Sequence, residues 1–427
     1  MNRSAAARLR AVTIPLAIGV LLAGVLVALA TPAQASTIVV DTFDDTWSPP
    51  DPDNCNGGAG PCTLRDAIEA ANHETGHTTI ELPEGTYTLD ASAEYGALRV
   101  HEDLTIVGLG DGATIEQPAD TRILTVWSAA LTIDNLTLTG GDVSGAEYPE
   151  NVGGAILLAS VSPNGTPSPP SLEVVNSTFA GNTAASGGAI GAVEGRLDLG
   201  AVTISGSTFT GNSAVAGSAV YLNANDAHGI DIVNSTFSGN TATSREIPWA
   251  AIYAGTFNAD LVITNSTIAD NAGGGVFTDE VTEVTVRNTI LAGNTGSDGA
   301  TPANCTGFGI VTSQGHNVVD DDTCGFAEDG DQAETDPQLE PLGDNGGPTA
   351  THAIGEGSPA YEGGDTDLCP ATDQRGEARK LPETCDVGAF EFVPVVEEPE
   401  DEPEEEPEEI DEAEPAEPVE DEPDYTG

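Results

Sequence analysis

Hydrophobic and polar residues alternate with a period of two inside a short segment that recurs along the middle of the chain. A clear copy is Leu-Glu-Val-Val-Asn-Ser-Thr-Phe-Ala-Gly-Asn, residues 172–182. In each copy apolar residues stand four and two places before a small polar residue, and another stands three places after it. Such alternation is typical of strands and not of helices. We call the small polar residue the hinge; hinges occur at Asn135, Asn176, Gly206, Asn234, Asn265 and Asn288, and more weakly at Glu84 and Gly108.

The hinges are 23 to 41 residues apart, a repeat length that indicates a solenoid or an array. Alternation disfavours helical repeats, and a propeller blade needs more residues than most of these spacings provide. A coil of three short strands fits the length, so the sequence predicts an all-β fold, a right-handed parallel β-helix. Eight or nine coils stacked at about 4.8 Å would make a rod of about 40 Å.

The hinge residue suits the corner of such a coil. Asn tolerates the left-handed backbone that a sharp corner requires, as Gly does. Stacked Asn amides can also bond to the coils above and below. We therefore expect a structural ladder made of Asn135, Asn176, Asn234, Asn265 and Asn288.

The N-terminus has the pattern of a secretory signal peptide. Three arginines precede an apolar run over residues 11–30, and Ala-Gln-Ala follows. The small residues predict cleavage between Ala35 and Ser36. The competing interpretation is an uncleaved anchor, because the run is long enough to span a bilayer. No other segment is apolar enough to cross a membrane, so we expect an extracellular or cell-surface protein without a span after signal removal.

Export changes the interpretation of the cysteines. All six lie outside the signal peptide, and outside the cytosol an even number at short separations indicates disulfides. A zinc site is the weaker interpretation, because no pair has the spacing of a metal knuckle. Proximity predicts three sequential pairs, although six cysteines allow 15 connectivities: Cys55 with Cys62, Cys305 with Cys324, and Cys369 with Cys385.

The chain is strongly acidic, with 70 Asp and Glu against 12 Lys and Arg. This balance disfavours nucleic acid and anionic membranes as partners. A solvated surface suited to salty surroundings and a surface that collects divalent cations both explain it. The Pro/Glu-rich end over residues 394–427 predicts a disordered, extended tail, because proline and like-charge repulsion oppose folding.

Residues 63–72 predict a short amphipathic helix, with Thr63 as N-cap and Asp66 in a near capping box. A solenoid needs a cap at its end, and this helix is well placed to close the first coil. The segment Cys-Thr-Leu-Arg-Asp-Ala-Ile-Glu-Ala-Ala-Asn, residues 62–72, resembles the CSLREA domain of secreted bacterial β-helix proteins.

Two further resemblances follow from the repeats and from the end of the rod. Gly-Gly-Ala-Ile at 153–156 and 187–190, with the Phe-x-Gly-Asn segments, is similar to the repeats of polymorphic outer-membrane adhesins. Asp-Asn-Gly-Gly-Pro-Thr at 344–349 and Asp-Val-Gly-Ala-Phe-Glu at 386–391 resemble the C-terminal region of choice-of-anchor Q proteins. These resemblances imply a pectin-lyase-like architecture and a surface location, and they assign no activity.

The expected organisation follows from these features. Its parts are a signal peptide (1–35), an N-terminal cap with the CSLREA-like helix and the first coil (36–97), β-helix repeats (98–336), a choice-of-anchor-Q-like region (337–393) and the tail (394–427).

Candidate chemistry is sparse. The sequence provides neither the basic residues of a lyase acting on acidic sugars nor a Gly-x-Ser-x-Gly elbow. We therefore assign no catalytic residue and no cofactor. Two acidic runs are candidate calcium ligands, residues 41–45 and 320–322, although solvated acids are the default interpretation. Arg375 and Arg379 resemble no lyase motif, and we expect buried or capping arginines paired with Asp373 or Asp386.

Binding residues are expected where the repeat is interrupted, because loops on a rigid scaffold often carry binding. The largest break is the Pro/Ser-rich excursion over residues 161–171. Tyr148 and Trp249, in longer insertions, are candidates for stacking on sugar rings, and packing at a coil edge explains them equally well. The sequence favours an adhesin-like rod that binds an extracellular glycan or a surface protein without catalysis. The alternatives are a polysaccharide lyase or glycoside hydrolase on the same fold, and a structural surface-layer component.

Overall fold

The computed structural model describes residues 36–45, 51–58, 60–74, 76–90, 96–160, 168–192, 198–224, 226–244, 249–255, 260–280 and 282–394. The predicted signal peptide and the predicted tail from residue 395 onward lie outside the described residues. Residues 161–167, which make up most of the Pro/Ser-rich excursion, also lie outside them.

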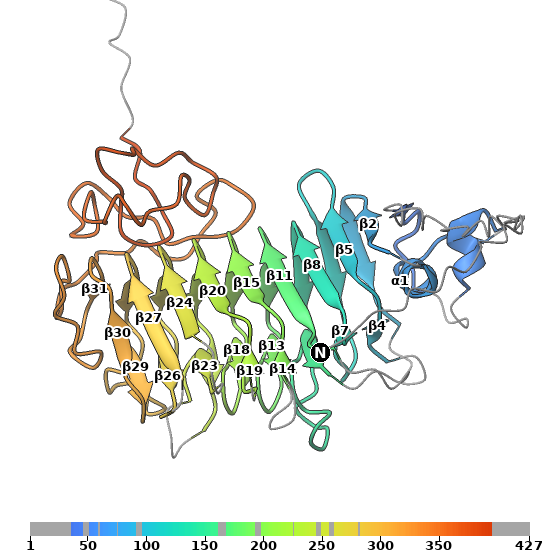
Figure 1. The fold of residues 1–427 in the computed structure, drawn as a ribbon, viewed down its shortest axis with the longest axis horizontal. Helices are drawn as coiled ribbons and strands as arrows, with labels where there is room; N and C mark the ends of the chain where they lie inside the picture. Colours follow the sequence, from blue (N-terminus) through green and yellow to red (C-terminus); the bar gives the residue numbers. More distant parts are fainter. Residues whose placement is uncertain are drawn as a thin grey trace, which may run out of the picture.

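The described chain winds through three parallel sheets, and each complete coil contributes one strand to each of them (Figure 1). The predicted all-β, right-handed parallel β-helix is confirmed. Sheet 1 has ten strands: β1 (Ser36–Val39), β2 (Thr78–Leu82), β5 (Leu104–Gly108), β8 (Ala130–Asp134), β11 (Ser171–Val175), β15 (Val202–Ser205), β20 (Ile230–Val233), β24 (Asp260–Thr264), β27 (Glu283–Arg287) and β30 (Val311–Ser313).

Sheet 2 follows sheet 1 in each coil and has nine strands: β3 (Gly85–Thr88), β6 (Ala113–Glu116), β9 (Leu136–Thr139), β12 (Thr178–Ala180), β16 (Thr208–Thr210), β21 (Thr236–Ser238), β25 (Thr267–Ala269), β28 (Ile290–Ala292) and β31 (Val318–Val319). Sheet 3 completes the coil with eight strands: β4 (Leu98–Val100), β7 (Leu124–Trp127), β10 (Ile156–Ala159), β13 (Ile190–Ala192), β18 (Val220–Leu222), β23 (Ile252–Ala254), β26 (Val276–Thr278) and β29 (Cys305–Gly307). Two small sheets pair β14 (Asp198–Leu199) with β19 (Asp226–Ala227) and β17 (Ser213–Ala214) with β22 (Thr241–Ala242).

Identical positions of successive coils stack inside the rod. Phe179, Phe209 and Phe237 are fully buried, and their rings lie nearly parallel with centroids 4.7 and 4.6 Å apart. Because side chains alternate across a strand, the apolar positions of the repeat all point inward and fill the interior. The period of two in the sequence is therefore the direct cause of the dry core.

The rod also contains a ladder of buried asparagines that the hinge positions did not predict. It consists of Asn182, Asn212, Asn240, Asn271 and Asn294, each the last residue of a repeat copy. The Nδ2 of each donates to the Oδ1 of the next at 2.8–3.0 Å, and Asn304 ends the series. The ladder satisfies polar groups that would otherwise be unpaired in the interior.

The predicted capping helix is present as α1 (Leu64–His73), preceded by the short 3-10 helix η1 (Pro52–Asn56). The Thr63 hydroxyl accepts the Asp66 N–H at 3.0 Å, as an N-cap does. Leu64, Ala67 and Ile68 are buried and join the core of the rod. Cys55 and Cys62 form a disulfide beside the start of the helix.

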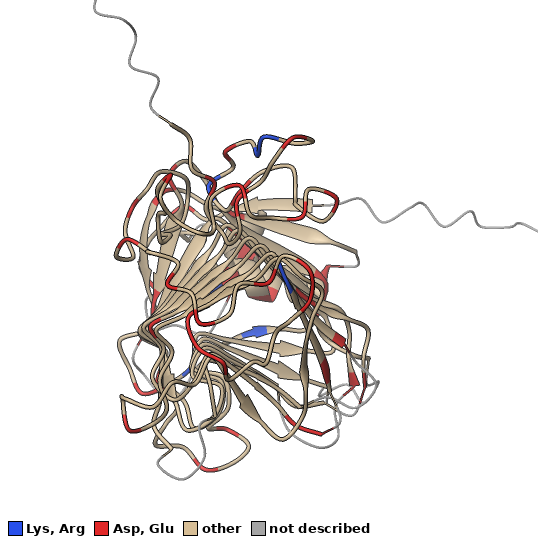
Figure 2. Ribbon diagram, turned by 90° about the vertical axis from the view of Figure 1, so that its left-hand side faces the viewer, with Lys and Arg blue, Asp and Glu red and all other residues tan. Residues whose placement is uncertain are grey.

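Residues 337–393, which we call the C-terminal unit, contain no helix or strand and fold back along the rod. In Figure 1 this unit lies above the last coils and leaves the first coils uncovered. Figure 2, turned by 90°, shows Asp and Glu spread over the loops and few Lys and Arg. No helix within the described ranges is long and apolar enough to cross a membrane.

Candidate functional site

The hinge residues form the corner between sheets 1 and 2. Asn135, Asn176, Asn234, Asn265 and Asn288 all have a left-handed backbone, with φ between 42° and 54°. The other strong hinge is a glycine with φ of 60°. Side chains tolerate this region poorly, which accounts for Asn and Gly at this position. We call this line of residues the hinge corner.

The hinge amides do not form the continuous ladder expected from the sequence. Asn288 donates to the Asn265 Oδ1 at 3.2 Å, and Asn135 donates to the Gly108 carbonyl at 3.0 Å. Most of the remaining bonds leave the rod. The physical reason is position: a hinge side chain lies on the outside of the corner, where the C-terminal unit competes for it.

The C-terminal unit is docked on the last coils through hinge amides. The Nδ2 of Asn234 donates to the Thr372 carbonyl at 2.8 Å. The Nδ2 of Asn265 donates to the Asp386 carbonyl at 3.2 Å. Farther along, Asn288 bonds to the Asp365 carbonyl at 3.1 Å. These contacts make the unit an irregular lid fixed along the rod.

Buried charges hold the lid together. Arg379 pairs with Glu391 at 3.0 Å, both fully buried, and donates to the Gly388 carbonyl at 2.9 Å and to the Asn234 Oδ1 at 3.1 Å. Burial lowers the pKa of Arg379, and Glu391 opposes that shift. Removal from water raises the pKa of the nearby Asp386 carboxyl to about 6, opposed by bonds from backbone N–H groups.

Arg375 binds the Asp373 carboxylate at 2.8 Å and lies over the Phe390 ring at 3.7 Å. Each arginine of the C-terminal pattern therefore has a carboxylate partner inside the unit. The partner of Arg379 is Glu391 and not Asp373 or Asp386, because the side chain of Asp386 is occupied by the N–H groups of Glu362 and Phe392. These arginines are structural.

A cleft opens on the hinge corner beside the edge of the C-terminal unit that faces the first coils. Its volume is about 560 Å³, and its lining combines the first coils of the rod with the edge of the unit. The lining residues are Val107, Gly108, Gly110, Asp111, Asp134, Asn135, Asn176, Gly347 and Pro348. We call it the corner cleft. A smaller hollow of about 80 Å³ shares four of these residues and adds Thr114, Thr137 and Thr178 of sheet 2.

Asp134 is the perturbed acid of the corner cleft. Partial burial raises its pKa above the ordinary value, and the charge of Glu173 on the adjacent strand raises it further. A hydrogen bond from Asn176 opposes the shift. The cleft thus combines one acid that holds its proton more firmly than usual with the exposed Asp111 and two amides, and the hydroxyls of Thr114, Thr137 and Thr178 lie in the adjoining hollow.

The predicted sugar-stacking residues lie apart from the corner cleft. Trp249 packs against Tyr253 and Phe277 on the outer side of sheet 3, with ring centroids 5.6 and 5.0 Å apart. It packs against a small cluster of buried residues that includes the rings of Tyr221, Tyr253 and Phe277, in agreement with the packing alternative. Tyr148 is 55% exposed and lies in the connection between β9 and β10. The two aromatics do not converge on one site.

The acidic runs are engaged within the rod. Asp41 accepts the Cys62 N–H at 2.8 Å, and Asp45 pairs with Arg65 at 2.6 Å. Asp320 accepts from the Asn304 amide at 2.7 Å, and Asp321 accepts from the hydroxyl of Thr323. Among the described residues, no group of three or more His, Cys, Asp or Glu is arranged to hold a metal ion.

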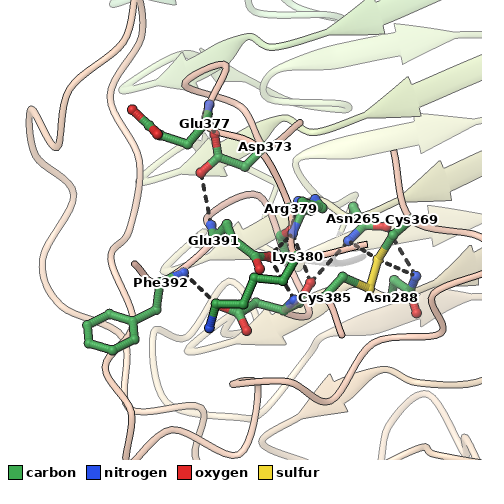
Figure 3. Close-up of polar contacts among 12 residues, drawn as sticks. Asn265, Asn288, Cys369, Asp373, Glu377, Arg379, Lys380, Cys385, Glu391 and Phe392 are labelled. Carbon is green, nitrogen blue, oxygen red and sulfur yellow. Dashed lines mark hydrogen bonds and ion pairs between the residues drawn. A yellow bond between two sulfur atoms is a disulfide. The ribbon is translucent and has the colours of Figure 1, made fainter. Parts of the chain in front are cut away.

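The disulfides pair in sequence order, as expected: Cys55–Cys62, Cys305–Cys324 and Cys369–Cys385. The second lies at the last coil and packs against the core of the rod. The third lies in the C-terminal unit, against the outside of the hinge corner, where Asn265 and Asn288 contact the Cys369 sulfur (Figure 3). Disulfides of this kind are typical of proteins that fold outside the reducing cytosol.

Sequence reasoning missed the corner cleft. Asp134 directly precedes the hinge residue Asn135, and Asp111 follows the hinge residue Gly108 by three positions, which is a signal that could have been used. Gly347 and Pro348 come from more than 150 residues farther on, and no pattern in the sequence places them against the first coils.

Comparison with models of protein families agrees with this architecture. A family model described as a right handed beta helix region matches residues 161–327. Among solved structures, the chain is similar to an alginate lyase of the PL6 family, AlyGC, with 15% identity and a TM-score of 0.39. That match covers 67% of this chain and 40% of the lyase chain. No curated protein matches. From residue 161 to residue 327, the chain is similar to the right-handed β-helix family, whose fold the structure displays.

Proposed function

We propose that this chain is an exported protein of the cell surface or the surrounding matrix, and that it binds an extracellular glycan without cleaving it. The observation that carries the proposal is the corner cleft, formed where the rod meets the C-terminal unit. Ligand sites are commonly found at such joints between structural units. The resemblance of residues 62–72 and 344–391 to secreted surface proteins supports the location.

The lining of the corner cleft suits hydroxyl groups. Asn176 offers an amide, Asn135 offers its amide oxygen, and Asp111 and Asp134 offer carboxylate oxygens; the Asn135 Nδ2 is already bonded to the carbonyls of Gly108 and Gly110. Sugar hydroxyls both donate and accept, so they can satisfy all of these groups. The rod holds the residues on adjacent coils, which fixes their spacing before a ligand arrives.

Lyase chemistry receives little support from the same lining. A lyase acting on acidic sugars needs a group that neutralises the substrate carboxylate and a base that removes a proton. None of the described residues that line the corner cleft is Lys, Arg or His. Elsewhere the arginines Arg65, Arg122 and Arg379 are committed to carboxylates of the fold.

Glycoside hydrolysis is a second candidate, favoured by the raised pKa of Asp134. A glycosidase uses one carboxyl that keeps its proton as the general acid and a second, ionised carboxylate as base or nucleophile. Asp134 would be the acid, and the exposed Asp111 would be the second group. The binding proposal predicts that these carboxylates accept hydrogen bonds from the glycan and leave its linkages intact.

One incubation separates these functions. The full mature chain is mixed with plant, algal and microbial polysaccharides, and both retention in affinity electrophoresis and new chain ends are measured. The proposal predicts retention by at least one polymer with no new reducing or unsaturated ends. Asp134→Asn tests the site, and Asp231→Asn is the matched control, because Asp231 is an exposed acid on the same face of sheet 1.

Three results would overturn the proposal. New reducing ends that disappear in Asp134→Asn would establish the hydrolase. Unsaturated ends would establish a lyase. Retention of no polymer would remove glycan binding altogether.

A further inference from the structure

One outward row of sheet 2 is occupied by threonine in seven successive coils. Strand register aligns each threonine with the next, from β3 to β25. We call this row the threonine row; its members are Thr86, Thr114, Thr137, Thr178, Thr208, Thr236 and Thr267. The outward row beside it is mixed and contains Thr88, Glu116, Thr139 and Ala180 in the first four coils.

Strand propensity alone does not explain the threonine row. Threonine favours strands and pairs well across them. The same preference acts on the neighbouring row of the same strands, where Glu116 and Ala180 occur. A contact made by the threonine row and not by its neighbour is therefore needed to explain a hydroxyl in every coil.

The C-terminal unit supplies that reason for the last three members. The Thr208 hydroxyl donates to the Ala350 carbonyl at 2.6 Å, and the Thr236 hydroxyl donates to the Gln374 Oε1 at 2.6 Å. Thr267 accepts the N–H of Ala389 at 3.1 Å. Here the row docks polar groups from three separate segments of the C-terminal unit.

The first four members have no such cover. Thr86 is exposed, and Thr114, Thr137 and Thr178 are half-buried. The last three of these line the hollow beside the corner cleft, with Pro348 at its rim. The open part of the threonine row therefore leads along the rod into the cleft, where the C-terminal unit stops.

This open strip has a fixed repeat. Its four threonines lie on successive strands, so they span three strand spacings, about 14 Å in all. Threonine is stiff at χ1, which holds each hydroxyl and methyl in one direction. A ligand that matches the strip presents polar groups at regular intervals along its own length, as a linear polysaccharide does.

Charge narrows the class of polysaccharide. Asp111 and Asp134 line the corner cleft, Glu116 stands in the adjacent outward row, and Glu84 lies close to Gly110. The backbone of Arg375 packs against Gly347, but its guanidinium binds the Asp373 carboxylate. The positive charge of Arg375 is therefore already paired and does not offset the acids of the cleft. A uronate or sulfated polymer would meet negative charge at each of these points.

We propose that the open strip and the corner cleft together bind a neutral linear polysaccharide, which runs along the rod over Thr86, Thr114, Thr137 and Thr178 and ends beneath Pro348. This inference rests on the proposed function and assigns its substrate class and its path. The covered threonines show that hydroxyls of this row bond to polar groups laid against sheet 2, and the open threonines present the same hydroxyls.

Calorimetric titration of the full mature chain with cellohexaose, mannohexaose and hexagalacturonate tests the inference. We expect at least one neutral hexasaccharide to bind and the hexagalacturonate not to bind. Thr137→Val with Thr178→Val removes two hydroxyls and keeps the β-branched shape, so affinity should fall about tenfold. The matched control is Thr203→Val, because Thr203 is a half-buried threonine on the outer face of sheet 1. This variant should bind the sugar with the affinity of the parent protein.

Each contrary result has a separate meaning. Tighter binding of hexagalacturonate than of the neutral sugars overturns the neutral class and leaves glycan binding standing. Neutral binding that the double valine variant does not weaken relative to Thr203→Val overturns the path along the threonine row. Binding of no hexasaccharide, together with retention of no polymer in electrophoresis, overturns the proposed function itself.

Discussion

Replacing Asn240 by alanine removes the middle member of the buried asparagine ladder. Asn240 is fully buried, and its Nδ2 donates to the Phe209 carbonyl at 2.9 Å and to the Asn271 Oδ1 at 2.9 Å. Its Oδ1 accepts the Asn212 N–H at 3.1 Å and the Asn212 amide at 3.0 Å. Alanine makes none of these four bonds.

The magnitude follows from the groups that are left behind. The Asn212 N–H and the Phe209 carbonyl each lose a bond inside the rod, where water cannot replace it. A buried polar group left without its partner costs about 1–3 kcal/mol, so the variant should lose roughly 3–5 kcal/mol of unfolding free energy. The Asn212 amide keeps its bond to the Phe179 carbonyl, which limits the damage.

Urea unfolding followed by circular dichroism measures this loss. The control is Asn56→Ala, because Asn56 is exposed and makes one bond to the Pro52 carbonyl. We expect the control to change stability by less than about 0.5 kcal/mol, as surface substitutions usually do. A loss below about 1 kcal/mol for Asn240→Ala would refute the reasoning, because the ladder would then not satisfy the interior as described.

The other predictions concern the C-terminal unit and the core. Arg379→Met leaves Glu391 buried without its partner and should lower the stability of the docked C-terminal unit by about 3–5 kcal/mol. The unit should then be cleaved faster by protease, and an unchanged rate of proteolysis would contradict the buried ion pair. Asp386 has its pKa raised from 3.8 to about 6, so the native state holds a proton that the unfolded state releases, and stability should fall by up to about 3 kcal/mol from pH 4 to pH 6 relative to Asp386→Asn. If the unfolding free energies of the two proteins changed in parallel with pH, the raised pKa of Asp386 would be excluded. Phe237→Ala should cost about 3–5 kcal/mol in urea unfolding, because the ring stacks on Phe209 at 4.6 Å inside the core, and a much smaller loss would mean that the stack collapses around the gap.

The coils could be predicted because their signals are local. Apolar alternation around Asn176 and Asn234 defines the strands, and the left-handed preference of Asn and Gly marks the corner. Both residues have the expected backbone, with φ of 48° and 46°. The capping helix could be predicted for the same reason, because its N-cap signal consists of Thr63 and Asp66, only three residues apart.

The buried ladder was encoded locally and was assigned to the wrong asparagines. Each ladder member stands six residues after its hinge, as Asn182 does after Asn176 and Asn240 after Asn234. Alternation distinguishes inward from outward positions on a strand, but it does not say which side of a corner an amide will occupy. Register between coils decides that, and register is a property of the stack.

The corner cleft could not be predicted, because it depends on contacts between distant parts of the chain. Asn234 and Thr372 are separated by 138 residues, and the residues 337–393 between the last coil and the tail have no periodicity to place them. The docked position of this unit determines which part of the threonine row is covered. The candidate site is therefore the gap that an irregular lid leaves on a regular rod.

The central claim is that glycan binds at the uncovered hinge corner, and hydrogen–deuterium exchange with mass spectrometry tests it most directly. The full mature chain is compared with and without the polysaccharide that retains it most strongly. The account predicts slower exchange in peptides that span residues 108–116, 134–139 and 345–349, and unchanged exchange on the outer face of sheet 1 at residues 230–233. Protection on sheet 1 or around Trp249, with none at the corner cleft, would contradict the account.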